Sequence, residues 1–242
     1  MTATKDEAYS HLQLLEKFLL SNGMPLGPDM SLEIRRIVTQ AKGVQDRKHL
    51  KQPEAAFLNT YVIPGTVRYL REVCGLNEVQ AREALLNEYH LSMPETSAAS
   101  PMHPGRLPFR KHMLGLTAKE VYRGWLKPAN ADGLTQSAPD FALRSPFQHR
   151  ILFEGKYFPR GSLDYARGQL AADLYQAFFY RGLAPMPAKK AGRPDWNYDY
   201  SCFLAFDASK DGTFRQAWLD LSPAIRKSFW DTANIYVMIL RD

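Results

Sequence analysis

Two carboxylates and a lysine stand close together in the segment from Pro139 to Phe158. Asp140 opens the first of two alternating strands, and Glu154 and Lys156 lie near the end of the second. Carboxylate oxygens are the hard ligands that Mg²⁺ prefers, and the ion keeps waters that can act as nucleophiles. A lysine there can orient or deprotonate such a water, or stabilise the charge that builds on a phosphate. These residue types therefore indicate magnesium-assisted hydrolysis.

The acids converge only if the two strands pair as a hairpin in one register. With a five-residue loop over 145–149, Asp140 lies directly opposite Glu154 and shares a face with Glu154 and Lys156. The other face is then apolar and consists of Phe141, Leu143, Ile151, Phe153 and Tyr157. A four-residue loop would instead pair Asp140 with Phe153 and place the acids on opposite faces.

The charged face of this hairpin has a second interpretation. Facing carboxylates repel and need a counter-charge, which a divalent cation would supply. Arg144, Arg150 and Lys156 could instead neutralise the acids in an outward salt-bridge network, and exposed pairs of that kind contribute little to stability. A purely structural protein with that face would have no affinity for nucleic acid.

The first 91 residues have helical periodicity. Apolar residues recurring every three or four positions predict helices over 5–21, 30–42, 53–73 and 77–90. Asn77 and Gln80 form a capping-box pattern at the start of the fourth helix, and Pro64 is expected to break or kink the third. Residues 92–108 are rich in Pro, Ser, Ala and Gly, which predicts a linker or long loop between a helical region at 1–91 and a core at 109–242.

Strands and helices are mixed after the linker. We expect a short helix over 117–126, the hairpin, a long helix over 162–181 and a strand over 201–206. The long helix carries an apolar stripe, and a polar stripe of Gln169, Asp173, Gln176 and Tyr180 runs roughly a quarter turn away. This order predicts an α+β or α/β fold with a mixed sheet flanked by helices.

Pro139-Asp140, a gap of 13 residues and Glu154-Gly155-Lys156 at the end of an apolar strand resemble the signature of the PD-(D/E)XK nuclease superfamily. The resemblance covers 109–242 and implies a restriction-endonuclease-like fold. It also implies that Asp140, Glu154 and the main-chain carbonyl of Gly155 bind Mg²⁺, with Mn²⁺ as a substitute, and that Lys156 assists the attacking water. The implied reaction hydrolyses DNA phosphodiesters to 5′-phosphate and 3′-hydroxyl ends.

The same resemblance suggests supporting residues. Gln176 and Tyr180 resemble the QxxxY motif of RecB-type members, in which it contacts the active site or DNA. Glu120 resembles the upstream helical acid that some members use as an additional metal ligand. Glu120 also fits a capping box that opens at Thr117, in which the glutamate closes on the start of its own helix.

Basic residues outnumber acidic ones, 31 to 25, and they are clustered. Six lie between Arg35 and Lys51 with one acid, and six more lie between 103 and 127 with one acid. Such clusters suit a polyanion, because neutralised phosphates release condensed counterions, although a charge run can equally be a solvated face. The expected nucleic-acid contacts are Arg106, Arg110, Lys111, Arg144, Lys189 and Lys190.

Other features exclude whole classes of protein. Cys74 and Cys202 form no CxxC pair, which argues against a zinc ribbon or an iron–sulfur cluster. No apolar run approaches the roughly 20 residues that a bilayer requires, and the sequence has no signal-peptide pattern at its start. We therefore expect a cytoplasmic protein without a membrane partner.

The sequence thus favours a magnesium-dependent endonuclease that acts on double-stranded DNA, with the helical region at 1–91 assisting recognition or dimerisation. A homodimer would supply the two sites needed to cut both strands, and its two-fold symmetry would match a palindromic target. The alternative is a non-catalytic DNA-binding module that keeps the nuclease fold. Such modules usually lose at least one of the three site residues, and this chain has all three.

Overall fold

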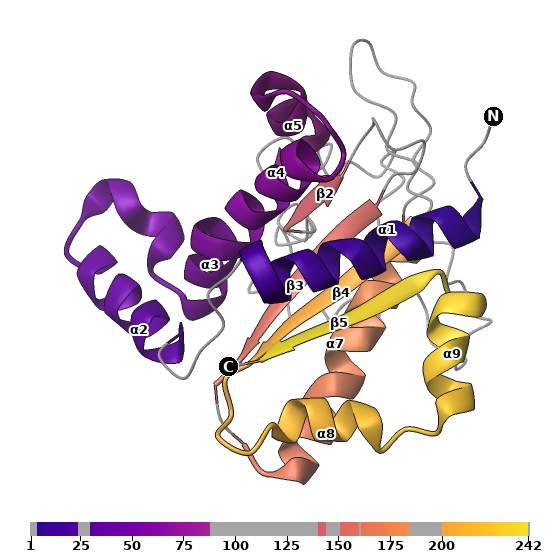
Figure 1. Cartoon of the computed structure of the whole chain (residues 1–242). Coiled ribbons are helices and arrows are strands. Elements are labelled where there is room, and N and C mark those ends of the chain that lie inside the picture. Colours follow the sequence, from indigo (N-terminus) through magenta and orange to yellow (C-terminus); the bar gives the residue numbers. More distant parts are fainter. Residues whose placement is uncertain are drawn as a thin grey trace, which may run out of the picture.

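A mixed sheet forms the centre of the protein (Figure 1). The computed structural model describes residues 4–23, 30–87, 140–143, 151–159, 161–183 and 200–241. Within them, five strands lie in the order in which they occur along the chain: β1 (Leu85–Asn87), β2 (Phe141–Leu143), β3 (Ile151–Phe158), β4 (Tyr200–Asp207) and β5 (Ile235–Arg241). β1, β2 and β3 pair antiparallel, whereas β3, β4 and β5 pair parallel. The predicted mixed sheet flanked by helices is confirmed.

Helices cover both faces of this sheet (Figure 1). The N-terminal helices are α1 (Lys5–Phe18), α2 (Met30–Ala41), α3 (Pro53–Phe57), α4 (Ile63–Glu72) and α5 (Glu78–Ala84). Shorter helical turns are η1 (Leu19–Gly23), η2 (Gln45–Leu50) and η3 (Leu58–Val62). The later helices are α7 (Leu163–Leu183), α8 (Thr213–Leu219) and α9 (Pro223–Asp231). None of the helices in these ranges is long and apolar enough to cross a bilayer.

The predicted N-terminal helices form with two differences. The segment 53–72 stays helical through Pro64, because the chain changes to a π-helical turn over Leu58–Val62 and Pro64 then lies in the first turn of α4. The helix predicted over 77–90 begins as expected, with the Asn77 and Gln80 side chains capping each other's backbone N–H groups. It ends at Ala84, because the next three residues add to the sheet as β1.

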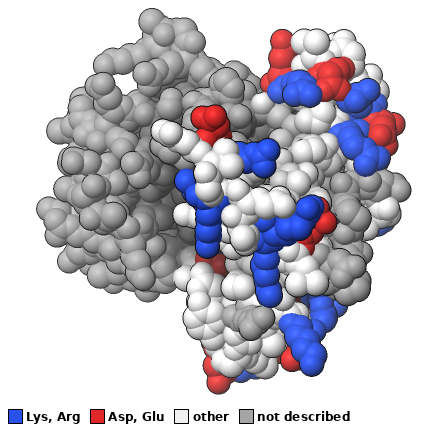
Figure 2. Space-filling view, turned by 90° about the vertical axis from the view of Figure 1, so that its left-hand side faces the viewer, with Lys and Arg blue, Asp and Glu red and all other residues white. Residues whose placement is uncertain are grey.

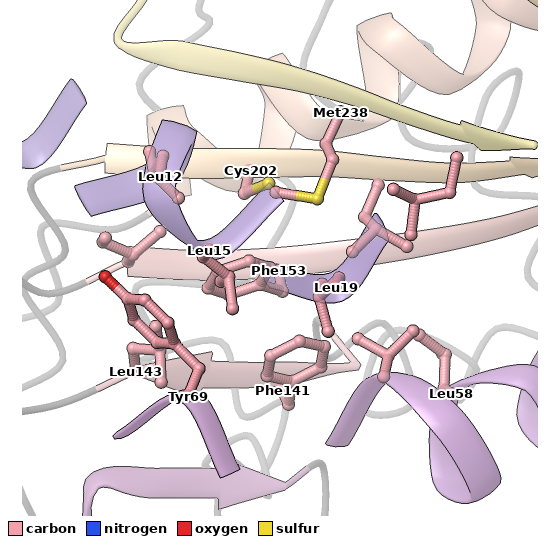
Figure 3. Packing of buried hydrophobic residues seen from close by; sticks show 14 of the residues in the cluster. Leu12, Leu15, Leu19, Leu58, Tyr69, Phe141, Leu143, Phe153, Cys202 and Met238 are labelled. Atoms are coloured by element: carbon pink, nitrogen blue, oxygen red, sulfur yellow. The ribbon is translucent and has the colours of Figure 1, made fainter. Parts of the chain in front are cut away.

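One large apolar cluster joins the N-terminal helices to the sheet. Figure 3 shows Leu12, Leu15 and Leu19 in one cluster with Phe141 and Phe153 of the hairpin strands, with Leu15 and Leu19 beside Phe153. The Phe141 and Phe153 rings are stacked with centroids 4.4 Å apart. The described part of the helical region therefore supplies one layer of the core beside the sheet, and its residues 85–87 supply one of the two outer strands of the described sheet.

The long helix α7 covers the opposite face. Its apolar stripe is buried against the sheet as predicted, through Ala166, Leu170, Leu174 and Ala177. These side chains pack with Phe158 at the end of β3 and with residues of β4 and β5. α7 connects β3 to the parallel strand β4. Because it packs on Phe158, it covers the face to which the even-numbered residues of β3 point.

Candidate active site

The candidate site lies where the hairpin strands part. Phe141 pairs with Phe153 and Leu143 with Ile151, which is the register predicted for the five-residue loop. β2 is three residues long and β3 eight, so β3 continues beyond its antiparallel partner. At this point the Asp140 side chain, and not a β2 residue, bonds to β3: Gly155 N–H donates a hydrogen bond of 2.7 Å to Asp140 Oδ2. Asp140 is thereby held against the backbone between Glu154 and Lys156.

Glu154 and Lys156 form a close, largely buried ion pair. Lys156 Nζ donates to Glu154 Oε1 at 2.5 Å, and the Glu154 side chain is 7% exposed and that of Lys156 18%. Ala142 and Leu152, on the same face, are buried as well. This face is therefore covered at these residues and is not the outward surface considered from the sequence, although Lys156 does neutralise Glu154 as that interpretation supposed. Arg144 and Arg150 lie outside the described residues.

A glutamate from the N-terminal region joins this pair. Glu54, at the start of α3, brings Oε1 to 4.0 Å from Lys156 Nζ. α3 and η3 can approach β3 this closely because Gly155 has no side chain: a Cβ there would lie 2.6 Å from Leu58 Cδ2. The sequence prediction for a helical acid was Glu120, which lies outside the described residues. Glu54 was missed because an acid in the first turn of a helix ordinarily only complements the helix dipole.

A further carboxylate reaches the site from α7. Asp173 is 4% exposed, and its Oδ1 accepts a hydrogen bond of 2.8 Å from Gln169 one turn earlier. Its Oδ2 is buried and has no hydrogen-bond partner among the described residues. Lys156 is the main charge that favours the ionised form of Asp173. The predicted polar stripe thus points Asp173 into the site, whereas the side chains of Gln176 and Tyr180 lie outside the described part of the structure.

The site holds more acidic than basic groups. Burial is the main cause that raises the pKa of Glu154 to about 7 and that of Asp173 to about 6. Burial and the neighbouring carboxylates also raise the pKa of Asp140, and burial raises that of Glu54. Burial alone would lower the pKa of Lys156, but the surrounding carboxylates raise it. The site therefore contains one ammonium, that of Lys156, and four carboxyl groups, those of Glu54, Asp140, Glu154 and Asp173.

This excess of acidic groups fits a divalent cation. Asp140, directly before β2, and Glu154, on β3, supply hard oxygen donors, and the main-chain carbonyl of Gly155 lies next to Glu154 in sequence. In the described ranges, no three acidic, histidine or cysteine side chains are already arranged as a metal site. Glu154 is engaged by Lys156 and Asp140 by Gly155 N–H, so both carboxylates would exchange partners on binding an ion.

The remaining predicted contacts are not described by the structure. The predicted nucleic-acid contacts Arg106, Arg110, Lys111, Arg144, Lys189 and Lys190 all fall in ranges outside the description. The two cysteines are free thiols, Cys74 half-buried and Cys202 buried.

No protein-family model, curated protein or solved structure matches this chain, so its function is inferred from the geometry and charge of this site.

Proposed function

We propose that the protein is a magnesium-dependent endonuclease of the restriction-endonuclease-like PD-(D/E)XK type, acting on double-stranded DNA. The observation that carries the proposal is the convergence of Asp140, Glu154 and Lys156 where β3 extends beyond β2. The hairpin, the α7 crossover and the parallel strand β4 support the assignment of the fold, because they follow the order that the resemblance implies. A homodimer would allow both strands to be cut.

Asp140, Glu154 and the Gly155 carbonyl are the groups that would hold Mg²⁺. The bound ion would supply a water of lowered pKa and neutralise charge on a phosphate. Lys156 remains protonated at neutral pH, because Glu154, Glu54 and Asp140 raise its pKa. It therefore acts as a cation and hydrogen-bond donor, orienting the attacking water or stabilising the charge that develops on the phosphate, and not as the base.

Glu54 and Asp173 serve as positioning residues for that ammonium. Glu154 Oε1 cannot keep Lys156 at 2.5 Å and also bind an ion through the same lone pair. Glu54 Oε1 already lies 4.0 Å from Lys156 Nζ, and Asp173 Oδ2 is a buried acceptor without a partner among the described residues. The ammonium can therefore leave Glu154 without becoming a buried charge that lacks a counter-ion.

The test compares wild-type protein with Lys156→Ala on plasmid and linear DNA, with Mg²⁺ or with a chelator. Lys210→Ala removes an exposed lysine beyond β4 and is the matched control. We expect cleavage by the wild type and the control only with Mg²⁺, and none by Lys156→Ala, whose DNA binding is retained. Equal cleavage by the wild type and Lys156→Ala would refute the assignment. Binding by both proteins without cleavage would instead favour the non-catalytic DNA-binding module.

A further inference from the structure

The segment from α2 to the start of α3 carries a row of basic side chains. Five of them, Arg35, Arg36, Lys42, Arg47 and Lys51, are called the basic face here; Lys51 is partly exposed and the others are exposed. Arg35 and Lys42 are seven residues apart at α2, so they lie on one side of the helix about 10 Å from each other. The apolar side of the helix, with Ile34, Val38 and Ala41, is buried. Figure 2, which faces the side of the molecule on which α2 lies, shows several basic side chains near the middle of the view, with a few acidic ones among them.

Most of this charge is not neutralised by the protein. Arg36 pairs with Glu33 at 3.1 Å, but Arg35, Lys42, Arg47 and Lys51 form no ion pair with another described residue. The cations of α4 and α5 differ, because each of them pairs with Glu72 or Glu78. The basic face therefore keeps a local excess of positive charge that is available to an anionic partner.

This face begins at the opening of the candidate site. Lys51 precedes Glu54 by three residues, so their Cα atoms are at most about 11 Å apart. α2 and η2 both pack against α3, which in turn packs on β3. The Glu54 side chain is 35% exposed whereas Glu154 is 7% exposed, so the site reaches solvent on the side of α3. A polyanion held by the basic face as far as Lys51 would therefore reach the neighbourhood of Glu54 and Lys156.

The composition of this segment favours a duplex. Residues 30–51 contain no Phe, Trp or Tyr, and proteins that hold single strands stack the bases on such rings. Lysine and arginine without aromatic residues instead contact backbone phosphates. We propose that the basic face binds the phosphate backbone of double-stranded DNA and positions it at the site. This inference deepens the proposed function and rests on it.

The test measures binding of a fluorescein-labelled duplex of about 30 base pairs, roughly three helical turns, by anisotropy, with a chelator present to prevent hydrolysis and over a series of salt concentrations. The variants are Arg35→Gln/Lys42→Gln and Arg47→Gln/Lys51→Gln. Lys210→Gln/Lys227→Gln removes the same charge from the region of α8 and α9 and is the control. Unchanged circular dichroism and urea midpoints establish that each variant is folded.

We expect each basic-face pair to lower the slope of log affinity against log salt by about 1.8, with an affinity loss of roughly tenfold or more near 0.1 M salt. The control should stay within about twofold of the wild type. Equal losses in the control, no binding by the wild type, or tighter binding of the single strand than of the duplex would each overturn the inference.

The two proposals fail in different ways in these experiments. Duplex binding that depends on the basic face, without any cleavage, keeps the surface and refutes the endonuclease. If cleavage depends on Lys156 but both basic-face double variants bind the duplex normally, the endonuclease proposal stands and the proposed role of the basic face is refuted.

Discussion

Gly155→Ala tests whether the close approach of the Glu54-bearing helix builds the site. The added Cβ would lie 2.6, 2.9 and 3.1 Å from three side-chain atoms of Leu58, which is itself 3% exposed. Crowding of this kind in a packed core costs about 1–3 kcal/mol. Replacing glycine restricts the unfolded chain and returns about 0.4–1 kcal/mol. We expect the free energy of unfolding to fall by roughly 1–2 kcal/mol.

Leu58→Ala provides the matched control in a double-mutant cycle. Alone, it removes a buried leucine and should cost about 2–5 kcal/mol. In the double variant the methyl group added at position 155 occupies space that the Leu58 side chain has left, so the combined loss should be smaller than the sum by about 1–2 kcal/mol. Urea unfolding followed by tryptophan fluorescence and circular dichroism measures all four proteins. Additive losses would refute the steric explanation.

The same cycle has a functional readout. Gly155→Ala should move α3 away from β3 and draw Glu54 away from Lys156, so that DNA cleavage falls while duplex affinity is unchanged. Leu58→Ala should restore part of the lost cleavage to Gly155→Ala. Unchanged cleavage by folded Gly155→Ala would show that the position of Glu54 is unimportant for the reaction.

Three further predictions concern charge and packing. The free energy of unfolding should fall as pH rises from about 4.5 to about 7. Over this range folded Glu154, with a pKa of about 7, keeps a proton that the unfolded chain has lost. Glu154→Gln should flatten this fall in urea titrations. Stability that rises over this range would contradict the direction of the shift. Asp173→Asn should slow cleavage by about tenfold, as expected for one charge-assisted hydrogen bond, without changing duplex affinity in anisotropy measurements. Phe141→Ala should cost about 3–5 kcal/mol of stability in urea unfolding, because the ring is fully buried against Phe153, whereas exposed Leu14→Ala should change it by less than about 0.5 kcal/mol.

The sequence contains enough information to define the hairpin and the face that α7 buries. Alternation places Phe141 and Phe153 on one side, and a slip of one residue would separate the two rings onto opposite faces, so only one register stacks them. The apolar stripe of α7 is similarly unambiguous, because Ala166, Leu170 and Leu174 recur at helical spacing. The sequence left a five-residue and a four-residue loop open, and the observed pairing of Phe141 with Phe153 is the one that the five-residue loop gives.

Only tertiary packing brings Glu54 and Asp173, which lie in distant segments, to Lys156. Glu54 in the first turn of a helix and Asp173 in a polar stripe both suit a solvent-exposed position, and neither pattern states which element lies opposite. The helix predicted over 77–90 ended early for a related reason, since residues 85–87 gain strand partners that only the fold provides. Periodicity determines which side of an element is buried, whereas long-range pairing determines which charged side chains meet there.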